Sequence, residues 1–207
     1  KAEVHTVEHV LAAVAGLGID DLVIDITALE PPILDGSFQP FAQALAEAGS
    51  VDHGGEVVED AVADAFHFGE GDSLYLVGPS KVGLHLDVSI EFPHPLIGRQ
   101  ARGFGITPEV FTAELAAART FGFVREVEAL RAKGLIAGGS TDNAVVLDET
   151  GVVGTTLRWP DEFVRHKAGD LVGDLALVGG RVRAQIVATK PSHRGNVALG
   201  RELVRHV

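Results

Sequence analysis

Segments with helical and strand periodicity alternate along this chain, but without the regular strand-helix-strand rhythm that builds a single parallel sheet. Apolar residues at helical spacing predict helices over residues 6–15, 38–49, 107–118, 161–175 and 195–207. Strand-like patterns cover residues 20–27, 62–68, 73–78, 82–92, 143–148 and 181–189. This irregular order predicts an α+β fold in which small sheets are each covered by helices.

The stretch 50–56 is the best candidate for a junction between two domains, because polar residues and a glycine pair interrupt the periodic segments there. We therefore expect residues 1–52 to belong to an N-terminal α+β domain and residues 53–207 to form a C-terminal α+β domain. A charged helical pattern over 124–134 lies between "RTFGF" and "NAVVLD". Residues 121–148 are thus expected to form a βαβ insert in the second domain.

Composition excludes several classes of function. Lysine plus arginine (17) against aspartate plus glutamate (29) gives a net charge of −12, and an acidic surface repels nucleic-acid phosphates. The chain has no cysteine, so His, Asp and Glu must supply any metal ligands. No apolar run reaches the roughly 18 residues of a membrane span, so we expect no transmembrane segment and a cytoplasmic setting. Because the chain has no methionine and opens directly into a helical pattern, we expect a fragment of a longer protein.

The helix expected over residues 161–175, "DEFVRHKAGDLVGDL", carries a second row of residues beside its core-facing stripe. The stripe comprises Val164, Ala168, Leu171, Val172 and Leu175. His166, Asp170 and Asp174 follow one another at one-turn intervals at the edge of this buried face. Side chains one turn apart, such as His166 and Asp170, can bind one cation together. For the His166 and Asp170 pair taken alone, a solvated charged flank is the better explanation.

A further ligand is expected from "HTVEHVLAA" near the start of the chain. His9 lies in the first turn of a helix, where the helix dipole disfavours a protonated imidazole and keeps the ring neutral. Glu8 points to another side of the helix, toward a metal-bound water, as a general base would. Two histidines and one carboxylate leave the open coordination position that hydrolytic zinc requires, and ferrous iron fits the same ligands. Taken singly, a capping Glu8 and a structural His9 explain these residues at least as well.

Four motifs together resemble the UDP-3-O-acyl-N-acetylglucosamine deacetylases, the zinc enzymes that commit bacteria to lipid A synthesis. They are "TVEHVLAAVAGLGIDDLVI", "PPILDGSFQPF", "ARTFGFVREVEALRAKGLIAGGSTDNAVVLD" and "DEFVRHKAGDLVGDL", and they occur in the family's order. The resemblance implies a two-domain β-α-α-β sandwich with a βαβ insert in the second domain. The family has strands before "TVEH" that this chain lacks, so the first domain is expected to be N-terminally incomplete.

The resemblance also implies the parts of a catalytic site. His9, His166 and Asp170 would be the zinc ligands, and Glu8 would be the general base. Thr120 would hydrogen-bond the oxyanion formed during hydrolysis.

Other implied roles concern the leaving group and the substrate. His193 would act as an acid toward the leaving amine, and Asp174 would keep that histidine protonated. Lys167 would contact substrate oxygens and Lys190 the diphosphate. Three further groups would contact the substrate: Phe121 near the sugar, Asn196 at a family asparagine position, and an acyl passage lined by Val124, Val127, Leu130, Ile136 and Val145. Simple helix-to-sheet packing also explains the acyl-passage residues.

The implied reaction is hydrolysis of the N-acetyl group of UDP-3-O-acyl-N-acetylglucosamine, which releases acetate and a free amine. The alternative is an incomplete or non-catalytic family member that binds metal or nucleotide-sugar. Intact ligands favour the first hypothesis, and the missing strands favour the second. We expect a monomer unless another chain completes the first sheet.

Overall fold

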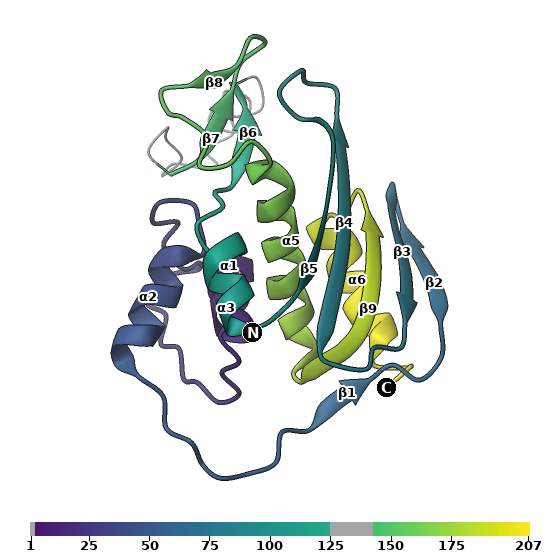
Figure 1. The fold of residues 1–207 in the computed structure, drawn as a ribbon. Coiled ribbons are helices and arrows are strands. Elements are labelled where there is room, and N and C mark those ends of the chain that lie inside the picture. The colour runs from purple at the N-terminus through teal and green to yellow at the C-terminus, as the bar shows by residue number, and fades with distance from the viewer. Residues whose placement is uncertain (1–2, 125–142) are drawn as a thin grey trace.

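The computed structural model describes residues 3–124 and 143–207 and shows a mixed α+β fold, which confirms the predicted fold class (Figure 1). The helices are α1 (Glu8–Gly16), α2 (Gln39–Ala48), α3 (Pro108–Val110), α5 (Glu162–Leu175) and α6 (His193–Leu203). A π-helical turn, η1 (Phe111–Leu115), directly follows α3, and a 3₁₀ turn, η2 (Ala176–Val178), follows α5.

The larger sheet has the strand order β2-β3-β9-β4-β5, with β1 beside the start of β9. These strands are β1 (Glu59–Ala61), β2 (Phe66–Glu70), β3 (Ser73–Gly78), β4 (Leu84–Phe92), β5 (Gly98–Gly105) and β9 (Arg181–Thr189). The central strand, β9, runs parallel to β4 and antiparallel to β3. The C-terminal end of β9 leads directly to α6, so this strand determines where the first turn of α6 begins.

A smaller sheet contains β6 (Phe121–Phe123), β7 (Val145–Leu147) and β8 (Val152–Val153) and lies at one end of α5 (Figure 1). β6 and β7 pair in parallel, which requires a crossover connection between them. The helix was predicted over 124–134, and all of this range after residue 124 lies outside the described residues.

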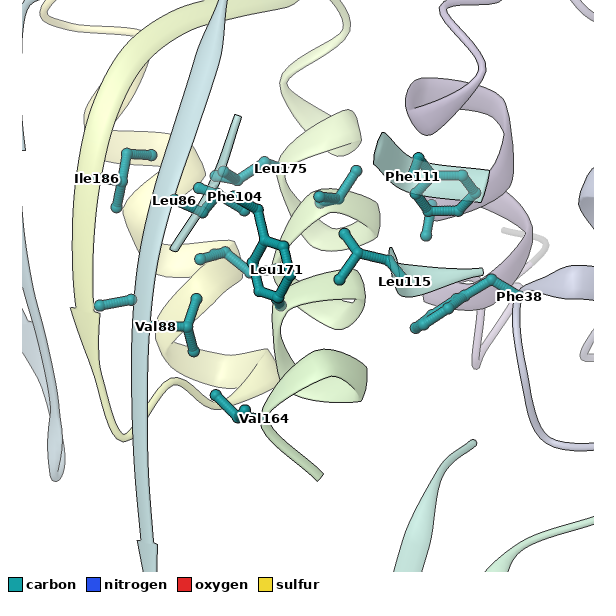
Figure 2. Packing of buried hydrophobic residues seen from close by; sticks show 14 of the residues in the cluster. Phe38, Leu86, Val88, Phe104, Phe111, Leu115, Val164, Leu171, Leu175 and Ile186 are labelled. Carbon is teal, nitrogen blue, oxygen red and sulfur yellow. The ribbon is translucent and has the colours of Figure 1, made fainter. Parts of the chain in front are cut away.

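The central helix, α5, lies between the larger sheet and the N-terminal helices (Figures 1 and 2). Its predicted stripe of apolar residues is confirmed as core. The sheet side of this core includes Leu86, Val88 and Ile186, and the opposite side includes Phe38, Phe111 and Leu115 (Figure 2). Because α5 packs on both sides, His166, Asp170 and Asp174 are buried, which contradicts the alternative of a solvated charged flank.

Two glycines of α5 allow other segments to approach its backbone closely. A Cβ atom at Gly173 would lie 2.0 Å from the carbonyl oxygen of Glu8, and one at Gly169 would lie 2.2 Å from the ring of Phe38. Glycine inside a helix costs about 1 kcal/mol relative to alanine. The close packing of α1 and Phe38 against α5 is what these glycines permit, and it brings the start of α1 beside the middle of α5.

The strand predicted over 20–27 was wrong. This segment has no regular strand structure, and within the described ranges no strand pairs with it. Leu22, Val23 and Ile24 are consequently exposed, Val23 by 85%. Alternating apolar residues favour a strand only where a neighbouring strand satisfies the backbone hydrogen bonds.

The start of α1 also differs from the prediction. Thr6 does not cap the helix, because it adopts a positive φ of 53° and its hydroxyl donates to Glu30 instead. Val7 takes the N-cap position without a side-chain hydrogen bond. The predicted stop is confirmed within a residue, since α1 ends at Gly16.

Later boundaries differ in two informative ways. β5 was not predicted, because its sequence "GRQARGFG" lacks alternating apolar residues, yet it pairs along the whole of β4. Helix α6 begins at His193, earlier than the predicted residue 195, because the hydroxyl of Ser192 accepts from the amide of Gly195 at 3.2 Å. The early start places His193 in the first turn of the helix.

Among the described helices, none is both long and apolar enough to cross a bilayer. The predicted cytoplasmic setting and the division at residues 52 and 53 stay predictions.

Candidate metal centre

The start of α1 and the middle of α5 bring His9, His166 and Asp170 together, with their potential ligand atoms within 4.8 Å of one another. His166 Nε2 lies 3.2 Å from Asp170 Oδ1, and His9 Nε2 lies 4.0 Å from the same oxygen. Atoms that each lie about 2 Å from one cation are at most about 4 Å apart. Both separations from Asp170 Oδ1 meet this limit and all three atoms lie within 4.8 Å, so the buried trio is close to the spacing of a single metal site.

The orientation of His166 leaves a free lone pair facing the site. Its Nδ1 atom lies 3.0 Å from the carbonyl oxygen of Ala118, which can only accept, so Nδ1 carries the proton. In the neutral ring, Nε2 then directs a lone pair at Asp170 Oδ1. That buried oxygen accepts no hydrogen bond from any described residue. Two facing acceptors without a donor between them fit a cation, so the trio passes this test as a metal site.

Charge at the trio also suits a metal. Burial lowers the pKa of His9 to about 4, and the neighbouring His166 adds to this, so the ring is in the neutral form that binds metals. Burial acts to raise the pKa of Asp170, but its interactions with His166 and with the ammonium of Lys167 hold it well below its usual range. Asp170 is therefore ionised, and its Oδ2 atom accepts from Lys167 Nζ at 2.8 Å.

Phe38 packs against both imidazoles of the trio. Its ring stacks on His166 at 4.9 Å between centroids and meets His9 edge-on at 5.0 Å. These contacts exclude water from one side of the histidines and fix their ring planes.

A second cluster, Glu8, Asp174 and His193, lies beside the trio. His193 Nδ1 donates to Asp174 Oδ2 at 2.9 Å, while His193 Nε2 lies 3.9 Å from Glu8 Oε1. The hydrogen bond to Asp174 raises the pKa of His193 to about 9, so the imidazole is protonated at neutral pH. Burial raises the pKa of Glu8, which makes its carboxylate a stronger base. A proton acceptor and a proton donor thus face the same space.

Two members of the trio, His166 and Asp170, and one member of the second cluster, His193, line a cavity of about 840 Å³. Among the residues singled out in the sequence, Thr120, Phe121, Val124, His166, Lys167, Asp170 and His193 line this cavity. Its other walls include Phe92, His94, Phe123, Leu147 and Ser192. A cavity with an apolar wall and a polar, charged end suits a ligand with the same two kinds of surface.

Other predicted residues lie elsewhere. Lys190 is exposed and pairs with Glu91 at 2.7 Å. Asn196 is buried behind Asp174, to which its amide nitrogen donates at 2.8 Å. Val145 is buried in β7. Val127, Leu130 and Ile136 lie outside the described residues.

Sequence reasoning missed several residues around the cavity. His94 lies between two prolines after β4, a signal of a rigid turn, and its Nε2 donates to the carbonyl of Asp148 at 2.7 Å. This bond joins the turn to the smaller sheet across the cavity wall. No sequence pattern signals the contact of Phe38 with His166, since the two are distant in sequence and meet only through packing.

A profile of the UDP-3-O-acyl N-acetylglycosamine deacetylase family matches residues 1–205. The chain belongs to this family. The resemblance inferred from the four motifs is thereby confirmed, and it extends over nearly the whole chain.

Similar proteins carry the same description. The UDP-3-O-acyl-N-acetylglucosamine deacetylase of Wolinella succinogenes is 42% identical over 99% of this chain and 68% of its own length. Its namesake from Nitratidesulfovibrio vulgaris is 45% identical over 94% of this chain and 63% of its own length. The deacetylase of the same description from Geobacter sp. is 42% identical over 99% of this chain and 67% of its own length. This chain thus spans about two thirds of the length of these relatives.

Proposed function

We propose that this chain is a zinc-dependent deacetylase that hydrolyses the N-acetyl group of UDP-3-O-acyl-N-acetylglucosamine, in the committed step of lipid A synthesis. The observation that carries the proposal is the adjacency of a three-ligand trio to a base and an acid, beside a cavity lined by His166, Asp170 and His193. Membership of the family and the names of the relatives support the substrate.

His9, His166 and Asp170 would hold the metal, and the two nitrogens and one carboxylate oxygen they offer suit zinc and also ferrous iron. When bound, zinc supplies a Lewis acid for the acetyl carbonyl and lowers the pKa of water toward about 7. The protein adds a dry, rigid setting for these ligands through Phe38 and the Ala118 carbonyl.

Proton transfer is assigned to two residues outside the trio. Glu8 accepts the proton of the attacking water, helped by the burial that raises its pKa. His193, protonated through its bond to Asp174, donates a proton to the leaving amine. Glu8 therefore takes a proton at one side of the site and His193 gives a proton at the other, and no covalent intermediate with the protein forms.

We assign the stabilisation of the oxyanion to the hydroxyl of Thr120. Its backbone is held on both sides, since its amide donates to the Gly36 carbonyl at 2.7 Å and its carbonyl accepts from Val145 at 2.8 Å. A preorganised hydroxyl that donates to developing negative charge contributes more than a mobile one.

The remaining contacts are assigned from the family resemblance. We assign Lys167 to substrate oxygens, Phe121 to the sugar, Val124 with Val127 and Ile136 to the acyl chain, and Lys190 to the diphosphate. Asn196, which the sequence resemblance placed with the substrate, is assigned to the support of Asp174 because it is buried behind that carboxylate.

Acetate release from UDP-3-O-acyl-N-acetylglucosamine by the purified chain tests the proposal. The metal-free protein should release little acetate, and addition of zinc should restore release. A folded, zinc-loaded protein that releases none would overturn it in favour of a family member that binds metal or nucleotide-sugar without turnover.

A further inference from the structure

A line of buried hydrogen bonds leads from the larger sheet to His193. The hydroxyl of Tyr75, on β3, donates to Asn196 Oδ1 at 2.7 Å. Asn196 Nδ2, on α6, donates to Asp174 Oδ2 at 2.8 Å. The same oxygen of Asp174, on α5, accepts from His193 Nδ1 at 2.9 Å. Three elements therefore meet in one polar chain.

The direction of each bond in this line is determined by chemistry. An ionised carboxylate only accepts, so Asn196 must present its NH₂ group to Asp174. The amide oxygen of Asn196 then faces away and needs a donor. Tyr75 and Asn196 are each 1% exposed, so water does not reach this position from the surface. The Tyr75 hydroxyl is the donor that satisfies the amide oxygen, and Tyr75 is the only tyrosine in the chain.

Close packing holds the first turn of α6 against β3 at the same place. A Cβ atom at Gly195 would lie 2.6 Å from the Tyr75 hydroxyl, so only glycine allows this approach. Ser73, on β3, donates to the Lys190 carbonyl at 2.8 Å, and its hydroxyl lies 2.9 Å from that of Ser192. The segment that carries His193 is thus positioned from the sheet.

We propose that Tyr75 is a positioning residue that acts through Asn196 and Asp174 to hold the His193 imidazole facing Glu8 and Asp170. The functional consequence rests on the proposed role of His193 as proton donor. Without the Tyr75 hydroxyl, the amide of Asn196 has an unsatisfied buried oxygen and its bond to Asp174 loosens. His193 then keeps its hydrogen bond to Asp174, but the orientation of its imidazole is no longer fixed.

Tyr75→Phe tests this directly, because phenylalanine fills the same space and removes only the hydroxyl. We expect kcat to fall about fivefold to tenfold, the size of one buried hydrogen bond, with KM and zinc content unchanged. Thr112→Val is the matched control, since it removes a hydroxyl that donates to the Pro108 carbonyl at 2.7 Å at an exposed site. An unchanged kcat in Tyr75→Phe would overturn the proposal.

Tyr75→Phe in a His193→Gln background distinguishes the positioning of His193 from a general loss of structure. If Tyr75 acts through His193, Tyr75→Phe lowers kcat in the wild-type background but not when His193 is already replaced. An equal fall in both backgrounds would mean a structural role only and would refute the proposal. Should Tyr75→Phe fold poorly, Asn196→Ala removes the middle link and must show the same background dependence.

A readout that needs no turnover distinguishes this inference from the proposed function. The His193 Nδ1 proton, bonded to Asp174, should give a low-field proton NMR signal in the zinc-loaded protein that is absent in His193→Gln. We expect this proton to exchange with solvent faster in Tyr75→Phe and at the wild-type rate in Thr112→Val. An exchange rate unchanged by Tyr75→Phe overturns the positioning role even if the wild type releases acetate. A faster exchange rate in Tyr75→Phe supports the positioning role even if the wild type releases no acetate.

Discussion

Two aspartates one turn apart on α5 have different tasks because their neighbours differ. Asp170 faces the imidazoles of His9 and His166 and has an oxygen with no donor among the described residues. Asp174 accepts hydrogen bonds from His193 and Asn196. Helical periodicity places both aspartates in one row. Their neighbours make Asp170 a candidate metal ligand and make Asp174 the hydrogen-bond partner of the candidate acid His193.

Glu8→Gln should lower kcat by at least about 100-fold while zinc content stays at the wild-type level. The amide cannot accept a proton as the carboxylate does, and Glu8 lies outside the trio. Acetate release and metal analysis of the same samples measure both effects. Glu3→Gln, at an exposed position, is the control. Wild-type turnover by Glu8→Gln would exclude Glu8 as the base.

Asp35 should make stability depend on acid pH. Burial opposes its charge, but hydrogen bonds from Ser37 and Arg158 lower the pKa of Asp35 below its usual value. A carboxyl whose pKa is lower in the folded state stabilises above its unfolded pKa, and this contribution is lost as pH falls through the folded value. Asp35→Asn should therefore cost about 1 kcal/mol at neutral pH and little near pH 2. Urea unfolding at both pH values measures the difference, and an equal cost at both would contradict the linkage.

At the scale of elements, the contact between α1 and α5 controls the metal centre. Gly173→Ala would place a Cβ atom 2.0 Å from the Glu8 carbonyl oxygen, so α1 must move away from α5. Because α1 carries His9 and α5 carries His166, we expect weaker zinc binding and at least about tenfold lower kcat. Zinc titration and the acetate assay measure these effects.

Gly200→Ala is the control for the element-level prediction, since it is also a glycine-to-alanine change inside a helix. The nearest atom to its Cβ would be Val178 Cγ2 at 3.4 Å, an ordinary contact. Alanine has the better helix propensity, so stability should rise by up to about 1 kcal/mol with zinc affinity unchanged. Equal effects of the two substitutions would show that packing at Gly173 does not govern the site.

At the scale of the whole molecule, a bound metal would tie the N-terminal helix to the central helix. A ligand that binds only the folded state stabilises it by about 2.7 kcal/mol at 100 times its dissociation constant. Chelation should therefore lower Tm, and zinc should restore it, whereas magnesium should not because it prefers oxygen ligands. In His166→Ala, calorimetry should show no shift on zinc addition. A zinc-induced shift in that variant equal to the wild-type shift would remove His166 from the ligand set.

The sequence by itself determined the local patterns of this protein. Helical spacing predicted α5, its core stripe and the one-turn interval from His166 to Asp170, because these depend only on the geometry of one helix. Turn residues predicted where α1 ends, and alternation predicted β3 and β9 with their observed bounds. The strand predicted at residues 20–27 does not form, because no described strand pairs with it. Strand β5 was not predicted, although it pairs along β4.

Only the tertiary structure decided which distant residues meet. The burial of α5 on both sides, the contact of Phe38 with His166 and the line from Tyr75 to His193 each join segments far apart in sequence. His9 and Asp170 become candidate ligands of one metal only because α1 packs against the glycines of α5. Periodicity describes the faces of one element, whereas a site arises from packing between elements, where close approach and unsatisfied polar atoms depend on all the neighbours at once.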